Sequence, residues 1–276
     1  MNYLFGRPVI ASKPRADGPR DVFVLGAYPS ALHVRWQVPG RARAVQAVAV
    51  DSEPEPFWTG DDEDSQIERW LREISFHPSW GHVAPCGRLN GSSGAWVDEM
   101  ILRPLGIDRS SAWITDCVDT YFESADAAAR LAEPEIVNAM MANGIPAPSH
   151  RAHPSENEIV REAIGVHSNR LRAELVAARP RIVVTLGNAA LRVLAALGGG
   201  GQVPRKLTPV SGLYGKPLGG RIEGLRFEWL PLAHPASPAL YQRAHREWAA
   251  AREATAREGV GSERRSPAVP GRRSTP

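Results

Sequence analysis

Short apolar runs that stop at turn-forming or polar residues recur along this chain. The first run stops at Gly26 and Pro29, and an apolar, β-branched run bounded by turn residues is typical of a buried strand. Each of the later runs also ends in a polar or turn residue. We predict that Val22–Ser30 is a buried strand ending in a sharp turn, and that further buried strands lie over Trp113–Cys117, Ile182–Leu186 and Leu225–Ala233.

Helical patterns alternate with these runs. Ser155–Ala178 has a capping serine, acids in its first turn and apolar residues at helical spacing, and helices are also expected over Asn188–Leu197 and Pro238–Arg257. Alternating helices and strands favour a parallel sheet. The sequence therefore predicts a single α/β domain over residues 1–258, a three-layer α/β/α arrangement with a central, mostly parallel sheet. We expect residues 259–276 to form a disordered basic tail.

Two further segments shape the expected pocket. His33–Trp36 and Val45–Asp51 are separated by a Pro-Gly turn signal, which predicts a hairpin. After it, the acidic, proline-rich segment Glu53–Asp64 is expected to be irregular. Either it forms a solvated start of the next helix, or one of its acids faces a reacting centre. His77–Asn90, interrupted by prolines, is expected to be an irregular loop.

Composition narrows the function classes. The formal charge of +3 and the pI near 9.1 permit a nucleic-acid partner without requiring one. Cys86 and Cys117 cannot form a four-thiolate cluster, and neither C-x-x-C nor H-E-x-x-H occurs, so we expect no metal and no cofactor. No apolar run reaches the length of a membrane span. We expect a soluble, cytoplasmic monomer that does not bind membranes.

The motifs at two predicted strand ends resemble those of a known superfamily. Gly26-Ala27-Tyr28-Pro29 follows the first strand, and His234-Pro235 precedes the last helix. This arrangement resembles the uracil-DNA glycosylase superfamily, whose first motif is Gly-x-x-Pro and whose last is His-Pro-Ser or similar. The resemblance implies a uracil-DNA glycosylase-like fold, DNA as partner, and a pocket at the carboxyl ends of the strands. Gly26, Ala27 and Tyr28 are expected to form one wall of it.

The resemblance implies a DNA glycosylase, which flips a base from the duplex and hydrolyses its N-glycosidic bond. His234 is the candidate that donates a hydrogen bond to the base oxygen as negative charge develops there. The alternative role for His234 is a structural cap on the last helix. Phe57 is the candidate for stacking on the flipped base. Tyr28 is a second candidate for stacking or hydrogen bonding, unless it is simply a core residue.

The first motif lacks the acid that family members often carry there to activate water, since its central positions are Ala27 and Tyr28. Thr59-Gly60-Asp61 resembles a segment in which an aspartate takes over that role, so Asp61 is the catalytic acid that we expect. Its neighbours Asp62 and Asp64 are alternatives for the same role, and Asp119 is a second source. Catalysis by leaving-group stabilisation alone, and a protein that binds DNA without cutting it, are the remaining alternatives.

Two departures from the superfamily bear on the substrate. Uracil-specific relatives carry a bulky ring after the motif proline, whereas Ser30 leaves room for a group on C5 of the pyrimidine. Asp116 stands where the superfamily usually has an asparagine, and a carboxylate accepts well from the exocyclic amine of cytosine. We therefore expect a C5-modified cytosine as substrate and a role in defence against phages with modified DNA. Uracil excision in repair is the alternative.

Contacts with the DNA strand are expected around the pocket. Small residues at a helix start suit phosphate contact, and the LGNAAL segment resembles the corresponding strand and helix of the superfamily. The candidates are Ser92, Ser93, Asn188, Ser237, Leu240 and Arg243.

Overall fold

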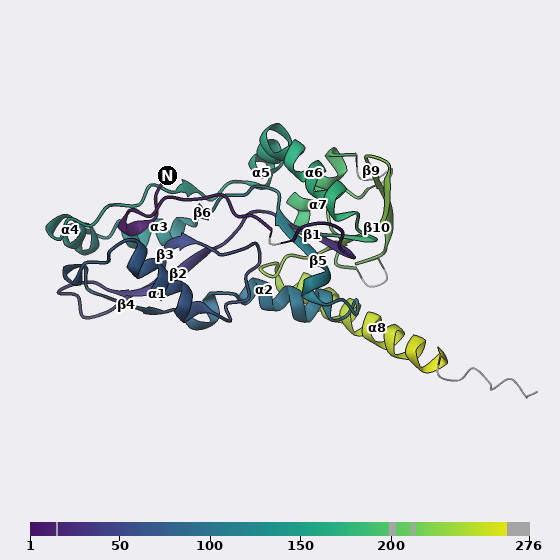
Figure 1. Ribbon diagram of the computed structural model, residues 1–276, viewed down its shortest axis with the longest axis horizontal. Coiled ribbons are helices and arrows are strands. Elements are labelled where there is room, and N and C mark those ends of the chain that lie inside the picture. Colours follow the sequence, from purple (N-terminus) through teal and green to yellow (C-terminus); the bar gives the residue numbers. More distant parts are fainter. Residues whose placement is uncertain (15, 199–202, 211–212, 264–276) are drawn as a thin grey trace, which may run out of the picture.

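The computed structural model of the chain describes residues 1–14, 16–198, 203–210 and 213–263, with a five-stranded central sheet in the order β5-β1-β8-β10-β9 (Figure 1). Every neighbouring pair in it is parallel except the β10-β9 pair at one edge. The prediction of a mostly parallel central sheet is confirmed. The strands are β1 (Val22–Gly26), β5 (Ala112–Asp116), β8 (Ile182–Leu186), β9 (Leu218–Ile222) and β10 (Leu225–Leu232).

Helices cover both faces of this sheet. Alternate side chains of a strand point to opposite faces, so Phe23 and Leu25 pack with α5, α6 and α7, whereas Val22 and Val24 face α2 and α8 (Figure 1). Fully burying one such side chain stabilises the fold by about 1.5–3 kcal/mol. The helices are α2 (Ser92–Val97), continued by a π-helical turn over Asp98–Leu102, α5 (Glu156–Glu162), α6 (Ser168–Ala178), α7 (Gly187–Ala196) and α8 (Ala239–Glu263).

A second, antiparallel sheet in the order β3-β2-β4 lies beside the first (Figure 1). The predicted hairpin forms its β2 (Ala31–Gln37) and β3 (Val45–Ser52). The prediction that His77–Asn90 is wholly irregular is wrong, because β4 (His82–Pro85) lies inside it. Val83 pairs with Trp36 of β2 in the sheet's own core, and tertiary burial of this kind overrides a weak local signal.

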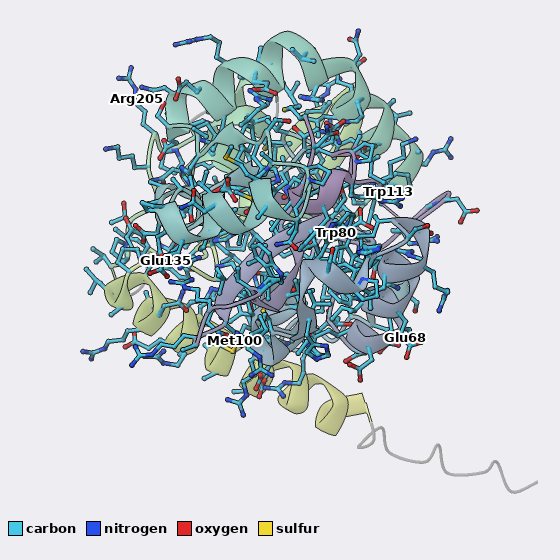
Figure 2. All side chains as sticks on the ribbon, turned by 90° about the vertical axis from the view of Figure 1, so that its left-hand side faces the viewer. Glu68, Trp80, Met100, Trp113, Glu135 and Arg205 are labelled. Atoms are coloured by element: carbon cyan, nitrogen blue, oxygen red, sulfur yellow. The ribbon has the colours of Figure 1, made fainter. Side chains whose placement is uncertain are left out.

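The remaining elements surround this second sheet or connect the two sheets. They are α1 (Glu63–Glu73), α3 (Ala125–Leu131), α4 (Pro134–Ala142), β6 (Phe122–Glu123) and β7 (Arg151–Ala152). Figure 2 shows Glu68 of α1 at the periphery of the molecule, and its side chain is 72% exposed.

Local signals set most helix boundaries. The predicted helix Ser155–Ala178 forms with Ser155 and Glu158 in a capping box, but a π-helical turn at Ala163–His167 divides it into α5 and α6. Helix α8 continues to Glu263 rather than ending at Arg257, because each added residue gains a hydrogen bond once a helix has begun. Part of the predicted tail is therefore helical, and residues 264–276 lie outside the described residues.

Among the helices that the structure describes, none is long and apolar enough to span a bilayer.

Candidate active site

A cavity of about 520 Å³ lies where β1, β5 and β10 end. In open α/β sheets, ligands bind at these carboxyl ends, and the volume is within the range of about 300–1,000 Å³ that is usual for small-molecule sites. Several predicted site residues from distant parts of the chain meet there. Those that line the cavity are Ala27, Tyr28, Ser30, Phe57, Ser93, Asp116 and His234.

Gly26 is the point at which this site becomes closely packed. A Cβ atom at this position would lie 2.1 Å from Asp116 Oδ1 and 2.5 Å from Phe57 Cε2. Neither neighbour is free to retreat, because Asp116 and Phe57 are both buried. The glycine is therefore required so that the carboxyl group and the aromatic ring can both rest on the end of β1.

Asp116 carries a buried carboxyl group at the end of β5. It is 2% exposed, and neither carboxyl oxygen has a hydrogen-bond partner among the described residues. Burial raises the pKa of Asp116 to about 8, against the opposing effect of Arg170. At neutral pH this shift favours the protonated form of the group. Arg170 Nη2 donates instead to the backbone oxygen of Asp116, at 2.8 Å.

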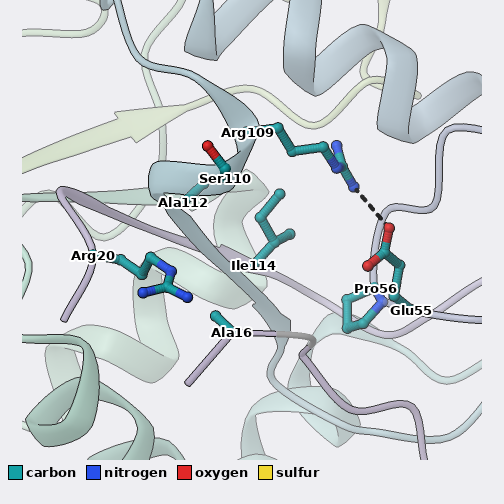
Figure 3. A pocket seen from close by; sticks show the side chains of 8 residues that line it. All are labelled: Ala16, Arg20, Glu55, Pro56, Arg109, Ser110, Ala112 and Ile114. Carbon is teal, nitrogen blue, oxygen red and sulfur yellow. Dashed lines mark ion pairs between the residues drawn. The ribbon is translucent and has the colours of Figure 1, made fainter. Parts of the chain in front are cut away.

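Phe57 is held in a constrained backbone conformation, with φ at +54°. Arg109 fixes it by donating to the Phe57 carbonyl oxygen at 2.5 Å while pairing with Asp98 at 2.6 Å. Figure 3 shows the same guanidinium reaching Glu55 across a neighbouring cavity, at 3.8 Å. The centroid of the Phe57 ring lies 6.3 Å from that of the His234 ring. The hydrogen bond from Arg109 to the backbone thus helps to keep the Phe57 ring in this position.

His234 follows β10 and is present as one defined tautomer. Its Nδ1 accepts a hydrogen bond from the Ala236 amide at 3.1 Å, so the proton of the neutral ring lies on Nε2. Burial lowers the pKa of His234 to about 4. A neutral imidazole with a free Nε2–H is suited to donate to an oxygen that gains negative charge.

A buried chain of hydrogen bonds fixes the backbone beside His234. The Ala233 amide donates to the Tyr214 hydroxyl at 2.6 Å, and that hydroxyl donates to His245 Nδ1 at 2.7 Å. His245 Nε2 then donates to the Met100 carbonyl at 3.0 Å. Each direction is determined, because the amide has only a proton to give and the carbonyl only lone pairs. The chain ties the end of β10 to the helix that follows α2.

Glu53 is a cavity residue that the sequence did not single out. It lies just after β3, is buried, and accepts a hydrogen bond at Oε1 from the Ser30 amide at 3.1 Å. Burial and, next, Asp116 raise the pKa of Glu53 well above that of an ordinary glutamate. The acidic loop was a sequence signal, but only the tertiary structure shows which of its acids faces the cavity.

Both predicted sources of the catalytic acid lie away from the cavity. Asp61 is exposed, and its Oδ2 accepts from the Thr59 hydroxyl at 2.8 Å. Asp119 pairs with His167 at 3.6 Å and with Arg170 at 3.8 Å. Neither is among the residues that line the cavity.

The expected DNA contacts have diverse surroundings. Asn188 Oδ1 accepts from the Leu207 amide at 2.9 Å, so this side chain holds a loop. Ser92 is exposed and donates to the Leu89 carbonyl, while the Ser237 amide donates to His234 O at 2.9 Å. Near the start of α8, Leu240 is 62% exposed and Arg243 pairs with Glu247 at 3.1 Å.

In the described part of the chain, no group of three or more His, Cys, Asp or Glu side chains is arranged to hold a metal ion. The fold and this site define an α/β protein whose pocket offers neutral hydrogen-bonding groups beside an aromatic ring. The sequence matches the family described as the uracil DNA glycosylase superfamily over residues 86–255, which is more than half of the chain. The chain belongs to this superfamily, as its motifs suggested. Membership implies DNA binding and a DNA glycosylase-type function. No curated protein matches the chain.

Gly26→Ala should destabilise the fold by about 1–3 kcal/mol, because the new methyl group overpacks the contact with Asp116 and Phe57. Urea unfolding measures the change. Gly219→Ala in the edge strand β9 is the matched control, since its Cβ would meet nothing within 4 Å. Equal stability of the two variants would contradict the close packing at Gly26.

Proposed function

We propose that this protein is a monofunctional DNA glycosylase that hydrolyses the N-glycosidic bond of a flipped-out pyrimidine, preferably a cytosine modified at C5. One observation carries the proposal. The neutral donor His234 and the unpartnered carboxyl group of Asp116 line one cavity together with the ring of Phe57. Buried polar groups without partners are costly in a folded protein, and a base edge would satisfy them.

The three side chains correspond to the three tasks of base excision. Phe57 stacks on the flipped base, and Asp116 faces the exocyclic group at C4. His234 Nε2 donates to the carbonyl oxygen at C2, where negative charge develops as the glycosidic bond breaks. The fixed tautomer of His234 supports this assignment, since its Nδ1 is already occupied by the Ala236 amide.

The choice of cytosine rests on Asp116. Below its pKa of about 8 the carboxyl group either donates or accepts, and so tolerates both an amine and a carbonyl at C4. When ionised it only accepts, which favours the amine of cytosine over the O4 of uracil. The preference for cytosine over uracil is therefore weaker at neutral pH than it would be if the carboxyl group of Asp116 were always ionised.

Room for a C5 substituent is supported by the small side chain of Ser30 and by the polar residues that line the same cavity. Ser30 is exposed and lines the cavity with a side chain of only one heavy atom beyond Cβ. The polar residues Ser124 and His153 also line the cavity. Bulky modified cytosines occur in the DNA of some bacteriophages, so defence against such phages is the biological role that follows from this substrate.

Contacts with the DNA strand are proposed for the rim. Ser93 lines the cavity, and Leu240 presents an apolar side chain that is 62% exposed near the start of α8. An apolar wedge of this kind can fill the gap that a flipped base leaves in the stack. Ser92, Asn188, Ser237 and Arg243 remain candidates for the flanking phosphates.

Excision assays decide between this function and its two alternatives. Duplexes that contain uracil, cytosine or 5-substituted cytosine opposite guanine are incubated with the protein, and abasic sites are detected as alkali-labile breaks. We expect the fastest excision for 5-substituted cytosine. Fastest excision of uracil would instead indicate uracil repair, and no excision of any base would indicate a catalytically silent DNA-binding protein.

His234→Ala should slow single-turnover excision by about 10²–10³, because it removes one donor to the departing base. His82→Ala, at an exposed histidine of β4, is the matched control and should keep the parent rate. Thermal unfolding checks that both variants are folded. Excision by folded His234→Ala at the parent rate would remove His234 from the mechanism.

Asp116→Asn should abolish a pH dependence of base choice. In the parent, the ratio of cytosine to uracil excision should rise as the pH passes through about 8, where Asp116 loses its proton. The amide does not titrate and can donate to O4, so the ratio should become flat. Above pH 8, where the parent carboxyl group is ionised, the ratio should lie about one to two orders of magnitude further toward uracil in the variant. Single-turnover rates for both bases on each side of this pH measure it, and a parallel pH dependence in parent and variant would contradict the assignment.

Ser30→Tyr should reduce excision of 5-substituted cytosine while leaving unsubstituted cytosine nearly unchanged, because the new ring occupies the space beside C5. The Ser30 amide is retained, so its bond to Glu53 is preserved. Ser30→Ala is the control that keeps the position small. The ratio of single-turnover rates for the two bases is the readout, and equal slowing of both would argue against a C5 pocket.

A further inference from the structure

Among the described residues, three acids line the cavity, namely Glu53, Asp116 and Glu156. Glu53 is the one that we consider as a general base. Hydrolysis of a glycosidic bond is assisted by a group that takes a proton from the attacking water. Of the three lining acids, Glu156 is neutralised by Arg192 at 2.8 Å. Asp116 lies at the end of β5, where it is assigned to the base edge. Glu53 is therefore the remaining candidate for the general base.

Glu53 lies beside the backbone of two site segments. The amide of Ser30, directly after the motif proline, donates to its Oε1 at 3.1 Å. The backbone of Phe57, which carries the stacking ring, lies close enough to lower the pKa of this carboxyl group. The side chain thus bridges the end of the first motif and the aromatic wall of the cavity. Ala27 and Tyr28, the first-motif positions at which other members of the superfamily often carry the acid, line the same cavity as Glu53.

The charges around Glu53 suit a base. Burial, followed by Asp116 at the end of β5 and Glu55 in its own loop, raises its pKa, while the amides of Ser30 and Phe57 lower it. On its other side Glu53 borders a second cavity, whose charged lining residues are Arg7, Lys13, Asp51, Arg69 and Glu73, and Tyr3 lies within electrostatic reach. A carboxylate with a raised pKa is a stronger proton acceptor than an exposed one.

We infer that Glu53 is the catalytic base of this enzyme and supplies from β3 the acid that the first motif lacks. The inference rests on the proposed function. As the bond between C1′ and N1 breaks, its electron pair goes to the base, whose C2 oxygen accepts a hydrogen bond from His234 Nε2. A water oxygen forms the new bond to C1′, and Glu53 takes one proton from that water. The departing base anion is then protonated by solvent.

Glu53→Gln tests this assignment. The amide oxygen can still accept from the Ser30 amide, but the group cannot take a proton, so single-turnover excision should fall by about 10²–10⁴ with little change in DNA affinity. In the parent, the rate should rise with pH through the pKa of Glu53, above the range of an ordinary glutamate, and this limb should be absent in the variant. Glu68→Gln, at an exposed glutamate of α1, is the matched control.

Two further variants separate the outcomes. Glu53→Asp retains a carboxyl group and should keep part of the activity and the acidic limb, which tests the assignment if Glu53→Gln does not fold. Asp61→Asn should retain the parent rate, because that residue lies outside the cavity lining. If the parent is active and folded Glu53→Gln is equally active, Glu53 is not the base. A loss of activity confined to Asp61→Asn would lead to the same conclusion. Either result would leave the proposed function intact. A parent that excises no base would overturn the proposed function as well.

Discussion

Desolvation of polar groups at the carboxyl edge of the sheet is the constraint on which this site depends. Asp116 is buried with no hydrogen-bond partner among the described residues, His234 is a half-buried neutral ring, and Glu53 is buried beside Asp116. In water each group would be solvated, and an unsatisfied buried polar group costs about 1–3 kcal/mol. The protein tolerates this cost because the surrounding structure leaves these groups no alternative position. The same desolvation makes each group chemically useful, since it raises the pKa of the acids and keeps the histidine a neutral donor.

Rigid contacts on every side maintain the arrangement. Gly26 lets Asp116 and Phe57 approach the end of β1, and Arg109 secures the Phe57 carbonyl. The hydrogen-bonded chain from Ala233 through Tyr214 to His245 fixes the segment that carries His234. None of these supporting residues is among those that line the cavity. They are the positions at which a substitution would loosen the site without removing any of its chemistry.

The features that could be predicted from the sequence are those that depend on local residue patterns. Strand ends at Gly26, Asp116 and His234 follow from apolar runs bounded by turn residues, and parallel pairing then brings them to one edge. Glu53 was missed because its role depends on a backbone amide that lies 23 residues away in the sequence. Asp61 was favoured by a local resemblance, yet its loop directs it to solvent. Strand β4 was also missed, because it is stabilised by pairing with β2 and its own residues have no clear strand pattern.

The protonation state of Asp116 is the most direct test of this account. Protein labelled with ¹³C at the aspartate carboxyl carbon can be titrated by NMR, with Asp116→Asn used to assign the resonance. We expect the Asp116 signal to be that of a protonated acid at neutral pH and to change as the pH passes through about 8. A signal that already titrates in the range of an ordinary aspartate, about 4, would show that the carboxyl group is solvated or paired. That result would contradict the desolvated site on which the proposed chemistry depends.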